Sequence, residues 1–319
     1  MASQSENQAT RRRKKMEPSR RAKMVITVIS EFNKNSYLRT HLREEKRPDS
    51  DFDKNFRYPE HLKKTRIDTE NFPMELLEWV DKETFDNPSD KIILQLHGGG
   101  YIGAFKNIYR TMAGLYGEVS KGASVLTPDY RVGPEYKHPA ALADAVAAYD
   151  WILEQGYTED RIILAGDSAG GGLAMALCHC LKDNNRKLPH AVVAMSPWTD
   201  LLSTGSSYKD NYSVDPVFGN ETQNLIYDNP YVEGIDKGDK YISPLYGDFT
   251  GFPPMLIQVG SNEMLLSDST LVADKAKEAG VQVKLSIYDG MFHVFQMGAK
   301  LMPESMNAWT EVGRFLNTL

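Results

Sequence analysis

Cysteine is scarce in this chain: two occur among 319 residues, which excludes a fold that depends on a network of disulfide bonds. Cys178 and Cys180 stand two positions apart on one predicted helix, so their side chains point to different faces and cannot easily bridge each other. No other cysteine and no cluster of histidines stands near them, which argues against a zinc or redox motif. We expect both thiols to serve in packing, and we expect a reducing, cytoplasmic compartment and neither a metal nor an organic cofactor.

Long hydrophobic runs are missing as well. The apolar stretch at residues 24–29 falls far short of the about 20 residues that a membrane-spanning helix needs, and it is too short for the core of a signal peptide. Hydrophobic residues make up 41% and charged residues 25%, a balance typical of a globular chain that buries a large core. The sequence therefore predicts a globular protein without a membrane span.

Positive charge is concentrated near the N-terminus. The lysines and arginines of residues 11–23 are opposed only by Glu17, although the whole chain has a net charge of −6. Such a run can bind nucleic acid or an anionic membrane, but it lacks interleaved aromatic residues and adjoins no DNA-reading motif. We therefore expect residues 1–23 to form a solvated basic tail, and we expect no nucleic-acid partner.

The most informative motif is Gly-Asp-Ser-Ala-Gly at residues 166–170. It stands between a strand pattern at residues 161–165 and a helix pattern that begins at Gly171. A strand that turns at once into a helix holds the central serine in a strained conformation, and glycines on either side avoid a clash. Ser168 is therefore a candidate nucleophile, although short strings of this kind also occur by chance.

A second glycine motif, His-Gly-Gly-Gly at residues 97–100, directly follows a buried strand pattern at residues 92–96. Its bare N–H groups can converge on an anion, and it lacks the Lys-Ser/Thr of a phosphate-binding P-loop. When a serine attacks an ester carbonyl, each donor aimed at the developing oxyanion contributes on the order of 10²–10³-fold in rate. We expect the amides of Gly98, Gly99 and Ala169 to form this oxyanion hole.

The general base and the acid are expected on loops near the C-terminus. His293 follows the last strand pattern, and among the histidines it alone has the order nucleophile, acid, histidine expected of such a site. The loop after the strand at residues 252–260 carries Glu263 and Asp268, and either carboxylate could orient His293. Glu263 is favoured because it is nearer the strand end, whereas Asp268 is expected to cap a helix at residues 269–279.

Strand and helix patterns alternate along most of the chain, which predicts an α/β fold with a doubly wound, mainly parallel sheet. The expected strands are residues 76–80, 92–96, 125–129, 162–165, 191–195, 255–260 and 283–288, and the expected helices are residues 140–155, 169–181, 269–279 and 305–316.

A helical cap is expected over the sheet. Residues 199–252 are too long for a simple connection and should form a lid, together with residues 24–55. The residues of the N-terminal part expected to pack over the pocket are Val25, Ile26, Val28, Ile29, Phe32, Tyr37 and Leu38.

From about residue 55 to the C-terminus the chain resembles the hormone-sensitive-lipase-like branch of the α/β-hydrolases, also called bacterial family IV esterases. Besides the two glycine motifs, the matching segments are residues 129–135, 139–144, 196–200, 243–245 and 290–293. Two positions depart from the family pattern. Gly133 replaces the usual alanine, and the acid loop after Gly260 lacks the commoner Asp-Pro-Leu.

The resemblance implies an α/β-hydrolase fold with a helical cap, in which residues 56–319 form the catalytic domain. It implies Ser168 as nucleophile, His293 as base, a carboxylate in the loop after Gly260, and hydrolysis of small-molecule carboxylic esters of short to medium acyl chain. Two alternatives stay open: an amidase or formamidase that uses the same residues, and a hydrolase-fold binding protein. A homodimer also stays open.

Overall fold

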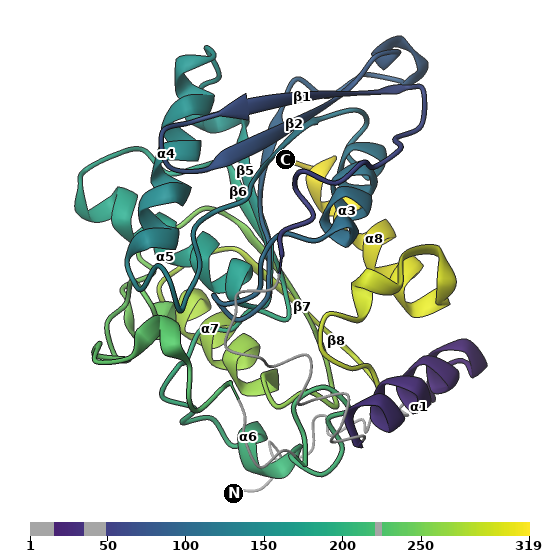
Figure 1. The fold of residues 1–319 in the computed structure, drawn as a ribbon, viewed down its shortest axis with the longest axis vertical. Coiled ribbons are helices and arrows are strands. Elements are labelled where there is room, and N and C mark those ends of the chain that lie inside the picture. Colours follow the sequence, from purple (N-terminus) through teal and green to yellow (C-terminus); the bar gives the residue numbers. More distant parts are fainter. Residues whose placement is uncertain (1–15, 35–48, 221–224) are drawn as a thin grey trace, which may run out of the picture.

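An eight-stranded sheet forms the centre of the computed structural model, which describes residues 16–34, 49–220 and 225–319 (Figure 1). Its strand order is β1-β2-β4-β3-β5-β6-β7-β8; β2 is antiparallel to both β1 and β4, and all other neighbours are parallel. The strands are β1 (Leu62–Asp68), β2 (Pro73–Trp79), β3 (Ile92–Leu96), β4 (Ser124–Pro128), β5 (Ile162–Asp167), β6 (Ala191–Met195), β7 (Met255–Gly260) and β8 (Val283–Tyr288).

Helices cover both faces of the sheet. Because successive side chains of a strand point to opposite faces, the neighbours Ile92 and Ile93 lie in two separate buried cores. Helices α4 (Ala140–Glu154), α5 (Ala169–Asp183) and α7 (Leu266–Glu278) cover one core, and α3 (Asn107–Val119) and α8 (Pro303–Leu316) cover the other. The predicted fold class, a doubly wound and mainly parallel sheet, is confirmed.

Among the elements of the sheet and its covering helices, β1 and α3 were not expected from the sequence. Strand β1 is an edge strand in which Lys63, Lys64 and Arg66 are exposed, so it contains no apolar run, and its pairing with β2 stabilises it. Helix α3 contains glycine, a weak helix former. At Gly117 a side chain is excluded because a Cβ atom would lie 2.4 Å from Trp79 Nε1. Both elements therefore depend on tertiary contacts more than on local propensity.

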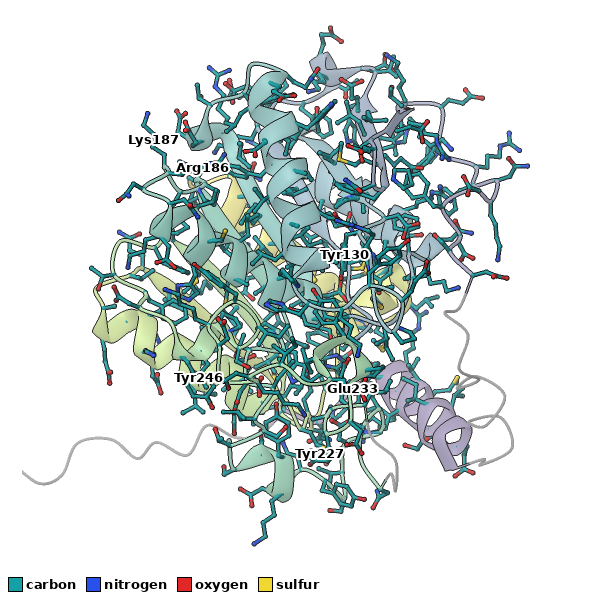
Figure 2. The ribbon with its side chains drawn as sticks, turned by 60° about the vertical axis from the view of Figure 1, so that its left-hand side comes forward. Tyr130, Arg186, Lys187, Tyr227, Glu233 and Tyr246 are labelled. Atoms are coloured by element: carbon teal, nitrogen blue, oxygen red, sulfur yellow. The ribbon has the colours of Figure 1, made fainter. Side chains whose placement is uncertain are left out.

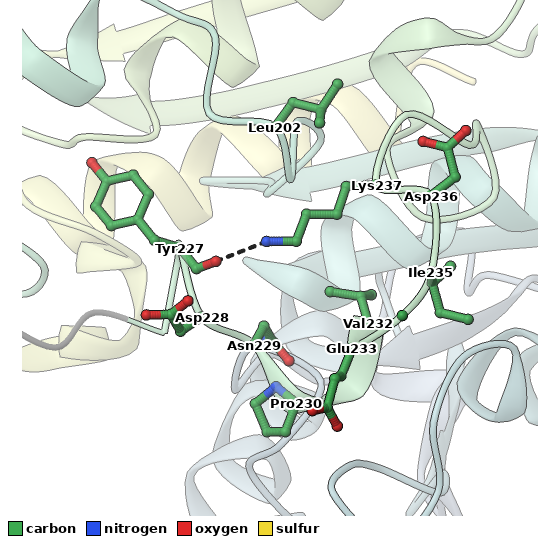
Figure 3. A pocket seen from close by; sticks show the side chains of 11 residues that line it. Leu202, Tyr227, Asp228, Asn229, Pro230, Val232, Glu233, Ile235, Asp236 and Lys237 are labelled. Atoms are coloured by element: carbon green, nitrogen blue, oxygen red, sulfur yellow. Dashed lines mark hydrogen bonds between the residues drawn. The ribbon is translucent and has the colours of Figure 1, made fainter.

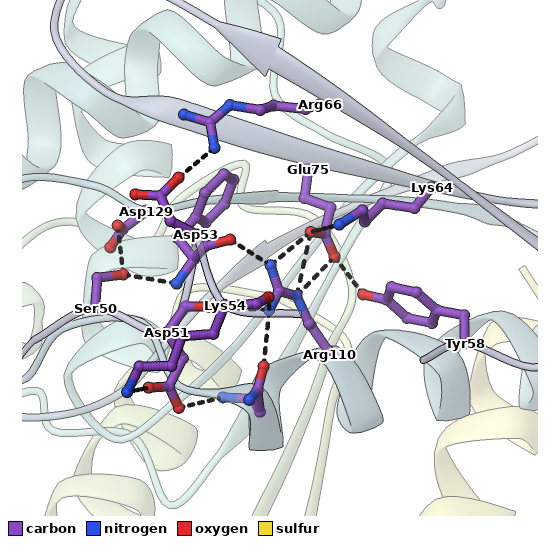
Figure 4. Close-up of polar contacts among 12 residues, drawn as sticks. Ser50, Asp51, Asp53, Lys54, Tyr58, Lys64, Arg66, Glu75, Arg110 and Asp129 are labelled. Atoms are coloured by element: carbon purple, nitrogen blue, oxygen red, sulfur yellow. Dashed lines mark hydrogen bonds and ion pairs between the residues drawn. The ribbon is translucent and has the colours of Figure 1, made fainter. Parts of the chain in front are cut away.

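The buried guanidinium of Arg110 holds residues 51–54, in the segment that precedes β1 (Figure 4). Arg110 on α3 is 1% exposed, and its Nη2 donates to a carboxylate oxygen of Glu75 at 2.9 Å. The same guanidinium donates to the carbonyl oxygens of Asp51, Phe52 and Lys54 at 3.0, 2.7 and 3.2 Å. Arg110 thus holds the chain just before β1 against α3 and β2.

The N-terminal helix α1 (Arg20–Lys34) lies beside the β8 end of the sheet (Figure 1). Its residues Ala22, Val25, Ile26 and Ile29 pack in a small cluster with Met291, Phe292, Phe295 and Met302, next to His293.

The expectation that this part of the chain packs over the pocket is therefore wrong for α1, because its apolar face is used against the histidine loop. Val28 is 63% exposed. Tyr37, Leu38 and the side chain of Phe32 lie outside the described residues.

Residues 199–252 form an insertion between β6 and β7 that is built mostly of turns. Its one described α-helix is the short α6 (Ser207–Asp210). Figure 2 shows Tyr227, Glu233 and Tyr246 on the end of the molecule that this insertion forms, away from Arg186 and Lys187. The proposed limits of tail, cap and catalytic domain stay predictions.

Candidate active site

Ser168 lies at a sharp turn between β5 and α5, with φ 51° and ψ −124°. Its amide donates to Met195 O at 2.9 Å and its carbonyl accepts from Trp198 N at 2.9 Å, so the strained backbone is held from β6. The turn is close to its neighbours: a Cβ atom at Gly170 would lie 2.1 Å from Leu96 O. The glycine of the motif is required because the helix starts directly against β3.

His293 joins the serine to a carboxylate. Its Nε2 lies 2.9 Å from Ser168 Oγ, and its Nδ1 lies 2.9 Å from Glu263 Oε2. An ionised carboxylate only accepts hydrogen bonds, so Nδ1 carries the proton and Nε2 is free to accept from the serine hydroxyl. All three side chains are 9% exposed or less. The structure therefore brings together the three residues that the sequence analysis selected.

Asp268, the alternative acid, lies elsewhere and does not cap a helix. Helix α7 begins at Leu266, so Asp268 is inside its first turn. Its Oδ2 accepts from the backbone amides of Thr199 and Asp200 at 2.7 and 2.8 Å. The capping expectation is wrong because the helix starts earlier and the carboxylate turns toward the chain that follows β6.

Burial raises the pKa of Asp268 to about 8, and the neighbouring carboxylate of Asp200 acts in the same direction. This side chain therefore has a structural role away from the histidine.

The structure of the glycine loop differs from the expectation at one oxyanion donor, Gly98. Gly98 N donates to Asp167 Oδ1 at 3.1 Å, so this amide is directed at a buried carboxylate and not at the serine. Gly99 and Gly100, by contrast, line the cavity that contains Ser168. Ala169 follows the serine at the start of α5, as expected. The loop turns more than the sequence suggested, since Gly99, Gly100 and Tyr101 all have positive φ angles.

Side chains from neighbouring elements hold this loop. The Tyr130 hydroxyl donates to His97 O, and the two rings stack with centroids 4.0 Å apart. From the insertion, Asn229 Nδ2 donates to Gly100 O at 2.7 Å. Asn229 also lines a separate hollow of about 600 Å³ in the insertion, where Lys237 Nζ donates to Tyr227 O (Figure 3). The insertion is therefore in direct contact with the glycine loop.

Asp167, next to the serine, is a buried carboxylate with an altered titration. Burial raises the pKa of Asp167 to about 7, while His293 and the Gly98 amide act in the opposite direction. The sequence analysis did not select this residue, although it lies within the Gly-Asp-Ser-Ala-Gly motif. Its contact with Gly98 links the turn at the serine to the glycine loop.

A cavity of about 350 Å³ contains Ser168 and His293. Its remaining walls are largely apolar and come from the insertion, the chain after β6, the loop after β7 and the histidine loop. They include Trp198, Val217, Phe218, Leu225, Ile226, Leu265, Val294 and Met297. The ring of Phe218 also lies 4.7 Å from that of His293, centroid to centroid. The site can thus hold a small apolar group beside the serine.

The helices in the described part of the chain are all too short or too polar to cross a membrane. Within the same residues, no three or more histidine, cysteine, aspartate or glutamate side chains are grouped as a metal site would require.

A strained serine after a parallel strand, paired through a histidine with a carboxylate, is typical of α/β-hydrolases. A family model described as the alpha/beta hydrolase fold matches residues 93–297, and the chain belongs to that family.

Similarity to known proteins shows to which branch of this family the chain belongs. The chain is 39% identical to an acetyl-hydrolase of Streptomyces hygroscopicus over 76% of this chain and 79% of that protein. It is 34% identical to an esterase of Acinetobacter venetianus, over 72% of this chain and 75% of the relative. A solved esterase of the bacterial hormone-sensitive lipase family superposes with a TM-score of 0.81 at 33% identity, covering 95% of this chain and 99% of that one. The chain is therefore an esterase of this branch, and the resemblance inferred from the motifs is confirmed.

Proposed function

We propose that the protein hydrolyses carboxylic esters of short to medium acyl chain through a covalent acyl-enzyme on Ser168. The observation that carries the proposal is the continuous hydrogen-bonded chain from Ser168 Oγ through His293 to Glu263. A serine hydroxyl is a weak nucleophile, and an adjacent base oriented by a carboxylate activates it.

The chemistry follows from this arrangement. His293 Nε2 takes the hydroxyl proton while Ser168 Oγ attacks the ester carbonyl, and Glu263 stabilises the positive charge that forms on the imidazole. The amides of Gly99, Gly100 and Ala169 are the donors for the oxyanion, because Gly98 is already bound to Asp167. His293 then returns its proton to the leaving alcohol. Water repeats both steps and releases the acid, so side chains, amides and water suffice.

The size and lining of the cavity support the substrate class. A volume of about 350 Å³ with largely apolar walls fits a small acyl group and leaves little room for a long chain. Relatives named as an acetyl-hydrolase and as an ethyl acetate hydrolase agree with small acyl groups. We therefore propose small, water-soluble esters as the substrates.

The decisive experiment combines a variant with a probe of serine reactivity. The wild-type chain should hydrolyse p-nitrophenyl acetate and butyrate and should be labelled by a fluorophosphonate, whereas Ser168→Ala should keep the fold and lose both. Removing the nucleophile of such a triad typically leaves only about 10³-fold over water from the remaining donors. Esterase turnover at the wild-type rate in Ser168→Ala would refute the proposal.

Two alternatives become outcomes of the same assay. Preference for a matched anilide over the ester would favour an amidase, and a folded wild-type chain that the fluorophosphonate does not label would favour a binding protein. A cytoplasmic location is also proposed, because Cys178 and Cys180 are both free. Fractionation of the producing cells tests it.

A further inference from the structure

We infer that Ser196 is a positioning residue that holds Glu263 and the histidine loop in register, and the inference rests on the proposed function of the triad. Ser196 follows β6 directly and is completely buried. Its Oγ donates to Glu263 Oε1 at 2.7 Å, the carboxylate oxygen that does not contact His293. A second hydrogen bond, from Val294 N to the same Oγ at 3.1 Å, reaches the residue after the histidine.

The direction of these hydrogen bonds is determined by their chemistry. A serine hydroxyl has a single hydrogen, and the amide of Val294 can only donate. The hydrogen of Ser196 must therefore point at Glu263, whose ionised carboxylate can only accept. One hydroxyl thus links the acid on the loop after β7 to the backbone on the loop after β8.

Glutamate needs such support more than aspartate would, because its side chain has one further rotatable bond. Oε1 is held by Ser196 Oγ and by the amide of Gly260 at 2.5 Å, which leaves Oε2 directed at His293 Nδ1. With both oxygens held, the carboxylate keeps one orientation toward the imidazole. An acid that rotates would present the wrong geometry to His293 for part of the time.

Ser196 and Val294, which one of these hydrogen bonds joins, both have backbone in the left-handed region, which non-glycine residues rarely adopt. Ser196 has φ 48° and Val294 has φ 50°. The surroundings stabilise the unfavourable conformation of Ser196, whose amide donates to Gln258 O at 2.6 Å. Strain of this kind is concentrated at functional sites, where the geometry it allows is part of the mechanism. Here it allows one hydroxyl to reach two catalytic loops.

The test compares Ser196→Ala and Ser196→Gly with Ser305→Ala. Glycine removes the hydroxyl and also relieves the positive φ angle, so a loss of activity in this variant cannot be attributed to strain or poor folding. Ser305 is an equally buried serine with one hydrogen bond, to Gln296 O at 2.7 Å, outside the triad. Active sites are counted with a fluorophosphonate, and kcat per labelled site and KM are measured on p-nitrophenyl acetate.

Both Ser196 variants should lower kcat on the order of 10-fold to 100-fold, the range typical when a partner that orients a functional side chain is removed. KM should change little, because Ser196 is not part of the cavity wall. Ser305→Ala should keep kcat. In a Glu263→Gln background, the additional loss from Ser196→Ala should nearly vanish, since Ser196 acts through Glu263.

The outcomes separate this inference from the proposed function. Unchanged kcat per labelled site in both Ser196 variants, or a loss that is fully additive with Glu263→Gln, would overturn the role of Ser196 while the triad stands. Absence of Ser168-dependent esterase activity in the wild-type chain would overturn both.

Discussion

At the scale of single residues, two buried aspartates and one glutamate show how environment decides the role of a carboxylate. Glu263 accepts from a hydroxyl, an amide and an imidazole, so both of its oxygens are held and it can orient His293. Asp167 and Asp268 accept from backbone amides, and burial raises the pKa of each. The three residues share one functional group but differ in their hydrogen-bond donors.

A comparison of two carboxylate variants tests the assignment of the acid. Glu263→Gln should reduce kcat on the order of 10²–10⁴-fold, because glutamine cannot stabilise the charged imidazole. Asp268→Asn should reduce it far less, since Asp268 accepts from Thr199 N and Asp200 N and not from the histidine. Steady-state kinetics on p-nitrophenyl butyrate measures both, and the reverse ranking would assign the acid to Asp268.

The raised pKa of Asp268 predicts how stability depends on pH. Its pKa is raised to about 8 in the folded chain by burial, whereas an unfolded aspartate titrates near about 4. The folded chain therefore retains a proton that the unfolded chain releases, so the free energy of unfolding decreases as the pH rises through this window.

Melting temperatures measured from pH 5 to pH 9 should fall toward pH 9 in the wild type and fall less in Asp268→Asn. The exposed Asp274 on the same helix provides a control, and Asp274→Asn should follow the wild-type curve. Parallel curves for Asp268→Asn and the wild type would contradict the prediction.

At the scale of elements, long-range ion pairing and packing position segments that lack strong local propensity. The chain before β1 has no regular structure from Asp51 to Lys54 beyond turns, yet Arg110 binds three of its carbonyl groups. Tyr58 also donates to Glu75, and Lys64 Nζ lies 3.8 Å from Glu75 Oε2. Because Arg110 and Glu75 are both almost fully buried, removing Arg110 leaves Glu75 with only the partly exposed Lys64 as a charge partner.

Replacing Arg110 alone should destabilise the folded protein more than replacing Arg110 and Glu75 together. Arg110→Met should lower the free energy of unfolding by about 3–5 kcal/mol, because the buried Glu75 would lose its closest cation and keep only the ammonium of Lys64, 3.8 Å away. The double variant Arg110→Met with Glu75→Gln should recover part of this loss. Urea denaturation followed by circular dichroism measures both, and a double variant less stable than the single one would refute the explanation.

At the scale of the whole molecule, the active site is assembled from segments far apart in the sequence. The serine follows β5, the acid follows β7 and the histidine follows β8, while the insertion supplies Val217 and Phe218 to the cavity wall. Helix α1 lies on the outside of the histidine loop, where Ser19 Oγ donates to Glu304 Oε2 at 2.9 Å. The N-terminal helix therefore supports the site from behind.

Truncations test this arrangement. Deleting residues 1–15 should leave activity on short esters nearly unchanged. Deleting residues 1–34 should lower both the melting temperature and kcat, because Met291, Phe292 and Phe295 lose the apolar face of α1. Deletion through Asn55 should lower stability further, since it also removes the carbonyl partners of Arg110.

Thermal melts and kinetics on the same preparations check the order of the three truncations. Equal stability of the 1–15 and 1–34 deletions would contradict a supporting role for α1. Salt-sensitive binding to DNA that disappears with residues 1–15 would contradict the prediction of a solvated tail.

The sequence by itself determined the fold class, the order of the strands and helices along most of the chain, and the serine and histidine of the site, and it left the acid between Glu263 and Asp268. These features are encoded locally: an apolar strand that ends in a glycine motif places its side chains at the carboxyl edge of a parallel sheet. For the same reason β1 and α3 were missed, because charged edge residues and helical glycines give a weak local pattern.

Only the tertiary structure decided which amide and which hydroxyl face the site. Gly98 and Gly99 are equivalent in the sequence, but the carboxylate of Asp167 on the next strand binds Gly98 and leaves the other glycines on the cavity wall. Asp268 and Ser196 likewise obtain their roles from partners on other loops. The direction of a hydrogen bond depends on groups that are distant in the chain and meet only when the sheet is assembled.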